Sequence, residues 1–142
     1  MSLEIRRADG RAEMDALLDL RHRVFCVEQG VPKREEIDGR DGDAIHLVAL
    51  RDGHVLGTCR LLFVDRTVQL SRLAVEPEAR REGIATALLH EADREAAAAR
   101  AKRIVLHAQT YARELYTADG YEPRGRTFVE AGIEHIAMEK RL

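Results

Sequence analysis

The order of residue patterns along the chain predicts an α/β fold, with a mixed and mostly antiparallel sheet and helices on both of its faces. Three strand-like runs follow one another between residues 44 and 75 without an intervening helix, which favours an antiparallel meander. A strand–helix–strand step then extends from Val68 to Ala108, and such a step returns to a parallel neighbour through a right-handed crossover. A chain of 142 residues without a linker-like segment fits one domain over residues 1–142.

The first third of the chain is predicted to hold a short strand and one helix. Residues 3–7 have the pattern of a strand. The 3.6-residue period of a helix is followed by Met14, Leu17, Leu18, Arg21 and Phe25. Residues 30–43 are rich in glycine and carry a proline, so they are predicted to form turns and loops.

The rest of the chain alternates strand and helix patterns. Strands are predicted at residues 45–50, 55–64 and 68–75, with the hairpin-favouring pair Asp52-Gly53 between the first two. The helical period returns from Ile84 to Ala96. A strand at 103–108, a helix at 111–119 that ends at Gly120, and a strand pair at 121–128 and 135–141 complete the order β-α-βββ-α-β-α-ββ.

Composition and charge exclude several classes of protein. The formal net charge is −2, which lacks the basic excess that nucleic-acid-binding domains carry, so no nucleic-acid partner is expected. No apolar run approaches the roughly 18–20 residues that span a bilayer, and the charged N-terminus lacks the apolar region of a signal peptide. Cys26 and Cys59 have no cysteine partner at metal-ligand spacing and are expected to be small buried side chains. A cytoplasmic protein without a membrane partner or a metal is therefore expected.

The most informative segment is the turn between the strand that ends at Val75 and the helix that begins at Gly83. A helix N-terminus leaves backbone N–H groups unpaired and concentrates partial positive charge, so phosphate oxygens fit there. Gly83 removes the Cβ that would keep a ligand away, and Arg80 and Arg81 add positive charge. Neither a P-loop nor a dinucleotide-binding fingerprint is present. The alternative is a purely structural strand-to-helix turn with solvated arginines.

Two motifs at the expected distance give a resemblance to a known family. The segment Arg80-x-x-Gly83-x-Ala85 resembles the [QR]-x-x-G-x-[GA] motif of the GNAT acetyltransferases. The segment from Gln109 to Tyr121 is similar to the family's N-x-x-A-x-x-[FL]-Y-x-x-x-G-[FY] motif, with Gln109 in place of the usual Asn. Arg81 stands where Gly is common. Further segments similar to the small bacterial ElaA-type branch lie at residues 23–31, 38–43, 46–48 and 128–138, so the resemblance covers nearly the whole chain.

The resemblance implies acetyl-CoA as a cosubstrate, bound where the strand before the turn splays from its parallel neighbour. The main chain of Leu73, Ala74 and Val75 would hold the pantetheine arm, and main-chain N–H groups from Arg81 to Thr86 would hold the pyrophosphate. The full set of expected cofactor-binding residues is Leu73, Ala74, Val75, Arg80, Arg81, Glu82, Gly83, Ile84, Ala85, Thr86, Gln109, Ala112 and Tyr116.

The resemblance also implies direct attack of a neutral amine on the thioester, without a covalent enzyme intermediate. Tyr116 matches the family's tyrosine near the sulfur and is the expected general acid, with a packed structural tyrosine as the alternative. His135 and Glu28 are the candidate general bases. His107, Arg72 or a chain of waters are the alternatives for that role.

The loop from Glu35 to Asp43 has five carboxylates in nine residues. These carboxylates would attract a cationic amine substrate, or they simply belong to a solvated loop. A metal site is the third alternative, but the residue spacing of a calcium-binding loop is missing.

The sequence therefore predicts an acetyl-CoA-dependent N-acetyltransferase that acts on a primary amine of a small molecule or of a protein. Two other functions stay open: a non-catalytic acyl-CoA-binding module on the same fold, and a phosphate-ligand binding protein unrelated to CoA. The residues do not identify the acceptor, and they leave a homodimer open.

Overall fold

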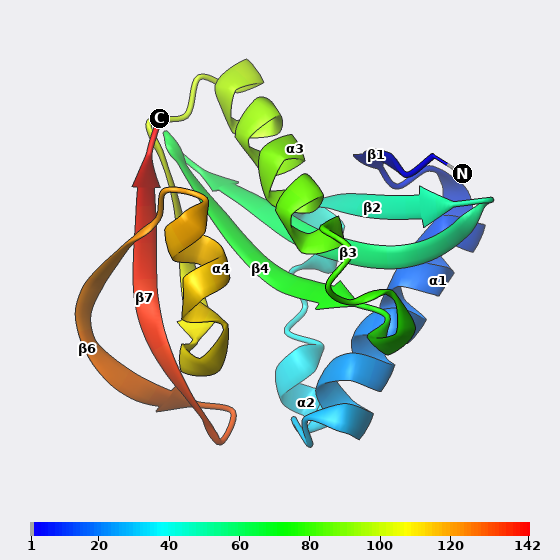
Figure 1. Cartoon of the computed structure of the whole chain (residues 1–142), viewed down its shortest axis with the longest axis horizontal. Helices are drawn as coiled ribbons and strands as arrows, with labels where there is room; N and C mark the ends of the chain where they lie inside the picture. The colour runs from blue at the N-terminus through cyan, green and yellow to red at the C-terminus, as the bar shows by residue number, and fades with distance from the viewer. Residues whose placement is uncertain (1) are drawn as a thin grey trace.

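The computed structural model describes residues 2–142 and has one seven-stranded sheet with helices on both faces (Figure 1). The strands are β1 (Glu4–Arg7), β2 (Ile45–Arg51), β3 (His54–Val64), β4 (Thr67–Val75), β5 (Arg103–Gln109), β6 (Glu122–Glu130) and β7 (Ile133–Arg141). The helices are α1 (Gly10–Arg21), α2 (Lys33–Glu36), α3 (Ile84–Ala98) and α4 (Arg113–Ala118), together with the π-helix η1 (His22–Glu28). Three short 3₁₀ turns are η2 (Asp41–Asp43), η3 (Pro77–Ala79) and η4 (Thr110–Ala112). The predicted α/β fold class is confirmed.

The sheet is antiparallel except at one pair of strands. Its strand order is β1-β2-β3-β4-β5-β7-β6, and β4 and β5 are the parallel pair. This pairing joins only residues 67–69 of β4 to residues 103–105 of β5. Beyond that point the strands diverge, and Figure 1 shows the two halves of the sheet meeting near the C terminus and separating toward the opposite end. The predicted splayed parallel pair is therefore present.

A β-bulge in β4 lies just beyond the point where the parallel pairing stops. Thr58 of β3 pairs with Ala74, but Arg60 pairs with Ser71, so β4 has one residue more than β3 in this interval. Arg72 lies within the bulge with a φ of +58°, in the left-handed region that a non-glycine residue rarely adopts. Because a bulge bends its strand and increases its twist, it directs the end of β4 away from β5.

The two faces of the sheet carry different helices because successive strand residues point to opposite sides. On β2, Leu47 and Ala49 belong to the large core cluster that includes the buried side of α3. The intervening residues Val48 and Leu50 pack with Leu17 of α1 on the other face. The α3–α4 face and the α1–α2 face are therefore distinct surfaces of one sheet.

The first helix differs from the sequence prediction at its C-terminal half. The 3.6-residue period was extended through Phe25, but α1 ends at Arg21 and the chain continues as the π-helix η1. The wider π turn, seen in the Gln29 N–H bond to the Val24 carbonyl, directs the end of the helix toward the splayed strands. The four-residue helix α2 was predicted as part of a loop, and the predicted helix at 111–119 is divided into η4 and α4.

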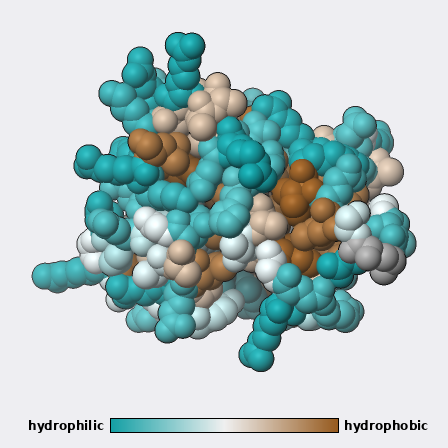
Figure 2. Space-filling view, turned by 45° about the horizontal axis from the view of Figure 1, so that its top comes forward, coloured by the Kyte–Doolittle hydropathy of each residue, from teal (hydrophilic) through white to brown (hydrophobic). Residues whose placement is uncertain are grey.

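The two cysteines are free thiols, but only Cys59 is fully buried, whereas Cys26 on η1 is half-buried. The molecular face in Figure 2 is mostly hydrophilic, with separate apolar areas between polar side chains. Within residues 2–142, no helix is long and apolar enough to cross a membrane.

Gly57 on β3 fits closely against the first turns of α3. A Cβ at this position would lie 2.8 Å from Ile84 Cγ2 and 3.2 Å from Leu88 Cδ1. We expect Gly57→Ala to lower the free energy of unfolding by about 1–3 kcal/mol, because overpacking forces neighbouring side chains or backbone to shift. Urea unfolding of the variant and the parent protein measures this difference.

The Ile84→Ala background is the control for that prediction. Removing the Ile84 methyl that the new Cβ would meet should make Gly57→Ala nearly neutral. An equal cost of Gly57→Ala in both backgrounds would show that the clash is not the cause.

Candidate active site

The splayed strands open a cavity of about 970 Å³. Its walls contain all of the expected cofactor-binding residues except Glu82. They also contain residues of η1, the segment around α2, and the β6–β7 hairpin, among them His107, Glu130 and His135. Tyr116 belongs to the core cluster on the α3–α4 face. His107 and His135 alternate in their strands with residues of that cluster, so they point to the α1–α2 face. The cavity therefore has walls from both faces of the sheet.

The turn before α3 has the backbone geometry of an anion-binding site. Gly83 is the N-cap with a φ of +85°, and no side chain caps the helix. A Cβ built at Gly83 meets nothing within 4 Å, so the space in front of the helix N-terminus is open. Arg81 has a φ of +65°, so the left-handed conformation is kept at a position where the motif that this turn resembles commonly has Gly. The first N–H groups of α3 thus have no capping side chain and face open space.

Arg80 and Glu28 form an ion pair beside this turn. The Arg80 guanidinium donates to both Glu28 carboxylate oxygens, at 2.7 and 2.8 Å, and to the Val75 carbonyl at 3.0 Å. The hydrogen bonds from Arg80 lower the pKa of the Glu28 carboxyl. This lowered pKa makes Glu28 a poor proton acceptor, and its carboxylate is bound by Arg80 at the turn. Glu82 lies outside the cavity wall and pairs with Arg51 at 2.9 Å.

Gln109, at the end of β5, bonds across the cavity to Gln29, the residue that follows η1. Its Nε2 donates to Gln29 Oε1 at 2.8 Å, and Gln29 Nε2 donates to the Tyr111 hydroxyl at 3.2 Å. Gln29 and Glu28 thus connect the end of the π-helix to both walls of the cavity.

Tyr116 on α4 is buried and reaches the cavity. Its ring packs edge-to-face on Tyr121, with 5.9 Å between centroids. In the described part of the chain, its hydroxyl has no hydrogen-bond partner. Burial raises the pKa of the Tyr116 phenol well above its ordinary value, so the hydroxyl is protonated at neutral pH and can donate.

His135 on β7 is 7% exposed and lies opposite Gln109 in the strand register. Its Nδ1 lies 2.7 Å from the Ile133 carbonyl, which can only accept a hydrogen bond, so Nδ1 carries the proton. In the neutral ring, Nε2 then has the lone pair that a general base needs. His107 on β5 is half exposed, and its Nδ1 contacts Glu130 at 3.2 Å.

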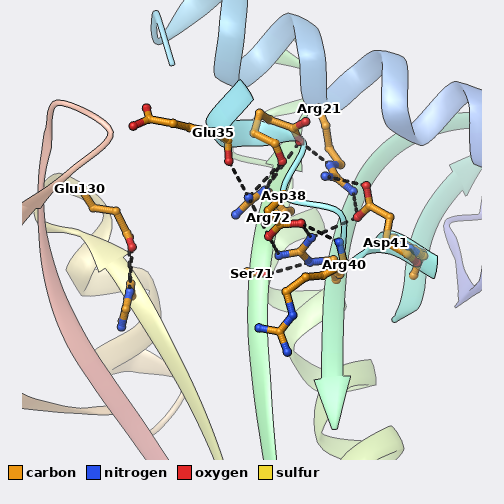
Figure 3. Close-up of polar contacts among 12 residues, drawn as sticks. Arg21, Glu35, Asp38, Arg40, Asp41, Ser71, Arg72 and Glu130 are labelled. Carbon is orange, nitrogen blue, oxygen red and sulfur yellow. Dashed lines mark hydrogen bonds and ion pairs between the residues drawn. The ribbon is translucent and has the colours of Figure 1, made fainter. Parts of the chain in front are cut away.

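The acidic loop is largely used in an ion-pair network with arginines of α1, β3 and β4 (Figure 3). Arg21 binds Glu36 at 2.6 Å and Asp41 at 2.9 Å. Arg60 binds Asp38 through two bonds of 2.8 Å and Asp41 at 3.1 Å.

Arg72 completes this network. It donates to the carbonyls of Glu35 and Glu36 and contacts Asp38 at 3.3 Å. Three of the five loop carboxylates are therefore paired with arginines, so for these three both interpretations, a solvated loop and a loop that attracts a cationic amine, are corrected. Arg72 was one of the alternatives for the general base. In the structure its side chain instead holds the α2 segment against the bulge of β4.

Arg21 and Arg60 are buried residues that the sequence analysis did not assign to the site. Arg21 is 1% exposed and Arg60 is 3% exposed. One signal was present: Arg21 falls on the apolar side of the predicted helix, where a charged side chain needs a buried partner.

Asp38 gives this network a pH dependence. Hydrogen bonds from Arg60 hold the pKa of the Asp38 carboxyl well below its usual value of 3.8. A carboxyl with a lower pKa in the folded state stabilises the fold above its unfolded-state pKa, and this contribution is lost as the pH falls through the folded-state value.

We expect Asp38→Asn to lower the free energy of unfolding by about 1–3 kcal/mol at pH 7, since it removes a charged partner of a buried guanidinium. The cost should shrink as the pH falls below about 4. Urea unfolding at pH 7, 5 and 3 measures it.

Asp43→Asn is the matched control, because Asp43 is exposed and makes no ion pair among residues 2–142. It should change stability by less than about 0.5 kcal/mol at each pH. A cost of Asp38→Asn that is the same at pH 7 and pH 3 would contradict the role of the Asp38 charge.

Comparison with known proteins agrees with this architecture. Residues 16–142 match the family model of the acetyltransferase (GNAT) domain. The chain therefore belongs to the GNAT acetyltransferase family and is an acyltransferase enzyme. Within the family it falls in the ElaA-type branch: the crystal structure of Escherichia coli ElaA is 27% identical and superposes with a TM-score of 0.88, covering 99% of this chain and 100% of ElaA.

Two further solved structures are similar. An acyl-CoA N-acyltransferase from Pseudomonas aeruginosa is 33% identical with a TM-score of 0.87, covering 98% of this chain and 99% of that protein. An aminoglycoside 6'-N-acetyltransferase, solved in complex with coenzyme A, has a TM-score of 0.79 at 19% identity, covering 97% and 96% of the two chains. The second similarity concerns the fold alone.

Proposed function

We propose that this enzyme transfers the acetyl group of acetyl-CoA to a primary amine of a small molecule or a protein, by direct attack within a ternary complex. The observation that carries the proposal is the cavity between β4 and β5, which has the uncapped α3 N-terminus and Tyr116 on one side and His135 on the other. A donor entering from the α3–α4 face and an amine entering from the α1–α2 face would meet in the gap between the strands.

The cofactor half of the cavity fits acetyl-CoA. The α3 N-terminus offers N–H groups to the pyrophosphate, and the open space at Gly83 lets it approach closely. Within the described residues, Leu73, Ala74 and Val75 pair with no residue of β5, so their main-chain groups on that side could bind the amides of the pantetheine arm, with the Val75 carbonyl exchanging its bond from Arg80. The coenzyme A complex of the fold relative with aminoglycoside activity is consistent with this use of the fold.

Gln109 and Arg80 would contribute side-chain contacts to the same ligand. In this structure Gln109 is bound by Gln29, the residue after η1, and Arg80 is bound by Glu28 at the end of η1. Their use would require exchange of these contacts for contacts with acetyl-CoA.

The reaction needs positioning and two proton transfers. The amine nitrogen bonds to the thioester carbon, the carbon–sulfur bond breaks, the amine proton goes to His135 Nε2, and Tyr116 gives its proton to the departing thiolate. Orientation of two reactants contributes roughly 7–11 kcal/mol in well-aligned systems. General acid–base catalysis adds about 10²–10⁴-fold. Tyr116 fits the acid because its hydroxyl is protonated and has no partner within the described residues.

The test has two stages. Calorimetric titration with acetyl-CoA measures binding, and release of free CoA thiol with a panel of primary amines then measures transfer. Binding followed by amine-dependent thiol release supports the proposal. Binding without release for any amine would favour a non-catalytic acyl-CoA-binding module. Absence of binding, or a nucleotide that outcompetes CoA, would favour a different phosphate ligand.

A further inference from the structure

The carboxylate of Glu130 lies between two imidazole rings at the acceptor end of the cavity. Its two oxygens are 3.2 and 3.3 Å from His107 Nδ1, and its Oε2 is 3.9 Å from His135 Nε2. The three residues come from β6, β5 and β7, and all line the cavity. Figure 3 shows Glu130 on the hairpin side, apart from the arginine–carboxylate network around α2.

The surrounding structure holds this arrangement in place. Phe128 packs edge-to-face on the His107 ring at 5.0 Å and stacks on the His135 ring at 5.9 Å. The tight turn through Ala131 and Gly132, both with positive φ, brings Glu130 opposite Ile133, whose carbonyl accepts from His135 Nδ1. One hairpin therefore sets both the tautomer of His135 and the carboxylate that its Nε2 faces.

We propose that Glu130 is a positioning residue for His135, an inference that rests on the proposed function. When His135 Nε2 takes the proton of the amine, the ring becomes an imidazolium in a largely buried position, where an unpaired charge is unfavourable. The Glu130 carboxylate, 3.9 Å from Nε2, stabilises the cation by its charge at that distance. His107 holds the carboxylate from its other side. The proton leaves afterwards from Nε2 to solvent at the open side of the cavity.

Other charged groups near His135 are arranged differently. Glu134 precedes His135 but points to the opposite side of the strand, and its Oε1 accepts from the Thr110 hydroxyl at 2.9 Å. Arg34, Glu35, Arg40 and Arg72 line the same cavity from the α2 segment and β4, and no ion pair joins any of them to His135. Within the described residues, Glu130 is the carboxylate that lies within 4 Å of His135 Nε2.

The experiment compares Glu130→Gln with Glu134→Gln in the intact protein. Both changes remove one charge from the same hairpin, but only Glu130 faces Nε2. The first readout is the NMR titration of the His135 ring, assigned by its loss in His135→Gln, and it requires no acceptor. We expect Glu130→Gln to lower the titration midpoint by about half a pH unit or more, and Glu134→Gln to lower it by less than half that amount.

The second readout is the pH profile of kcat/KM with an accepted amine. Glu130→Gln should lower the plateau by about tenfold and move the acid limb to lower pH in step with the His135 midpoint. A general loss of folding would lower the plateau without moving the limb, and a thermal melt of each variant monitors it.

The outcomes separate this inference from the proposed function. If His135→Gln keeps full turnover, the base assignment in the proposed function is wrong. If His135→Gln loses turnover but the two glutamate variants titrate alike, the proposed function stands and the role of Glu130 is overturned. If no amine is acetylated, the proposed transfer fails, and with it the catalytic role of Glu130, even where the His135 midpoint moves.

Discussion

Gly83→Asp is expected to weaken acetyl-CoA binding by more than about 100-fold while the protein stays folded. The new carboxylate would stand at the uncapped N-terminus of α3, where the pyrophosphate is proposed to bind, and would compete for the same N–H groups. Fold damage should be small, because a Cβ at Gly83 meets nothing within 4 Å and Asp tolerates the left-handed conformation better than most residues. Calorimetric titration with acetyl-CoA measures the loss, and a thermal melt measures the stability.

Gly83→Asn is the matched control for this prediction. Asn has nearly the same size and the same tolerance of positive φ, but no charge. It should weaken binding by less than about tenfold, since only the bulk of the side chain opposes the ligand. If Asn and Asp weaken binding equally, the effect is steric and not electrostatic. If neither variant changes the affinity, the α3 N-terminus does not hold the pyrophosphate.

The elements that the sequence predicted well are those with a strong local pattern. The strands β2 to β5 and the helix α3 each have a clear period, and their observed ends differ from the prediction by only one or two residues. The turn with Arg81 and Gly83 was recognised through a short motif. Such a motif can be recognised in a sequence because the backbone geometry of the turn allows few residue types. The parallel pairing of β4 and β5 followed from the order strand–helix–strand, because a helix between two strands returns the chain to the end of the sheet from which it started.

The parts that the sequence did not predict depend on contacts between distant segments. Nothing in residues 35–43 indicates that their carboxylates meet Arg21, Arg60 and Arg72, because these arginines belong to three other elements. The ion pair of Glu28 with Arg80 joins residues 52 positions apart, and it pairs a candidate base with an arginine of the turn before α3. The sequence also does not predict the π-helix η1, because the apolar period before Arg21 does not indicate that the helix changes from α to π.

Tyr116 is a case in which the sequence located a residue but could not give its environment. The motif placed it on the helix after β5, whereas its burial, its raised pKa and its partnerless hydroxyl follow from the packing of α4 on the core. These properties distinguish a proton donor from a surface tyrosine, and they make a single substitution informative.

Tyr116→Phe is expected to lower kcat by about 100-fold and to leave the Kd of acetyl-CoA within about twofold. The phenyl ring keeps the edge-to-face contact with Tyr121, and no group of the described chain loses a hydrogen bond when this hydroxyl is removed. Thiol-release kinetics and calorimetry give the two quantities. Because burial raises the pKa of this phenol, kcat of the parent enzyme should show no basic limb near the ordinary tyrosine pKa of 10.

The matched control is Tyr121→Phe, which makes the same change in the neighbouring ring. The Tyr121 hydroxyl is also buried and has no partner among residues 2–142, but Tyr121 does not line the cavity. This variant should therefore keep kcat within about twofold of the parent enzyme, as removal of an unpaired buried hydroxyl is near neutral for the fold. If both variants lose activity alike, the cause is packing around α4 and not proton donation. If Tyr116→Phe keeps the parent kcat, the thiolate leaves without an acid at this position, and solvent in the cavity must supply the proton.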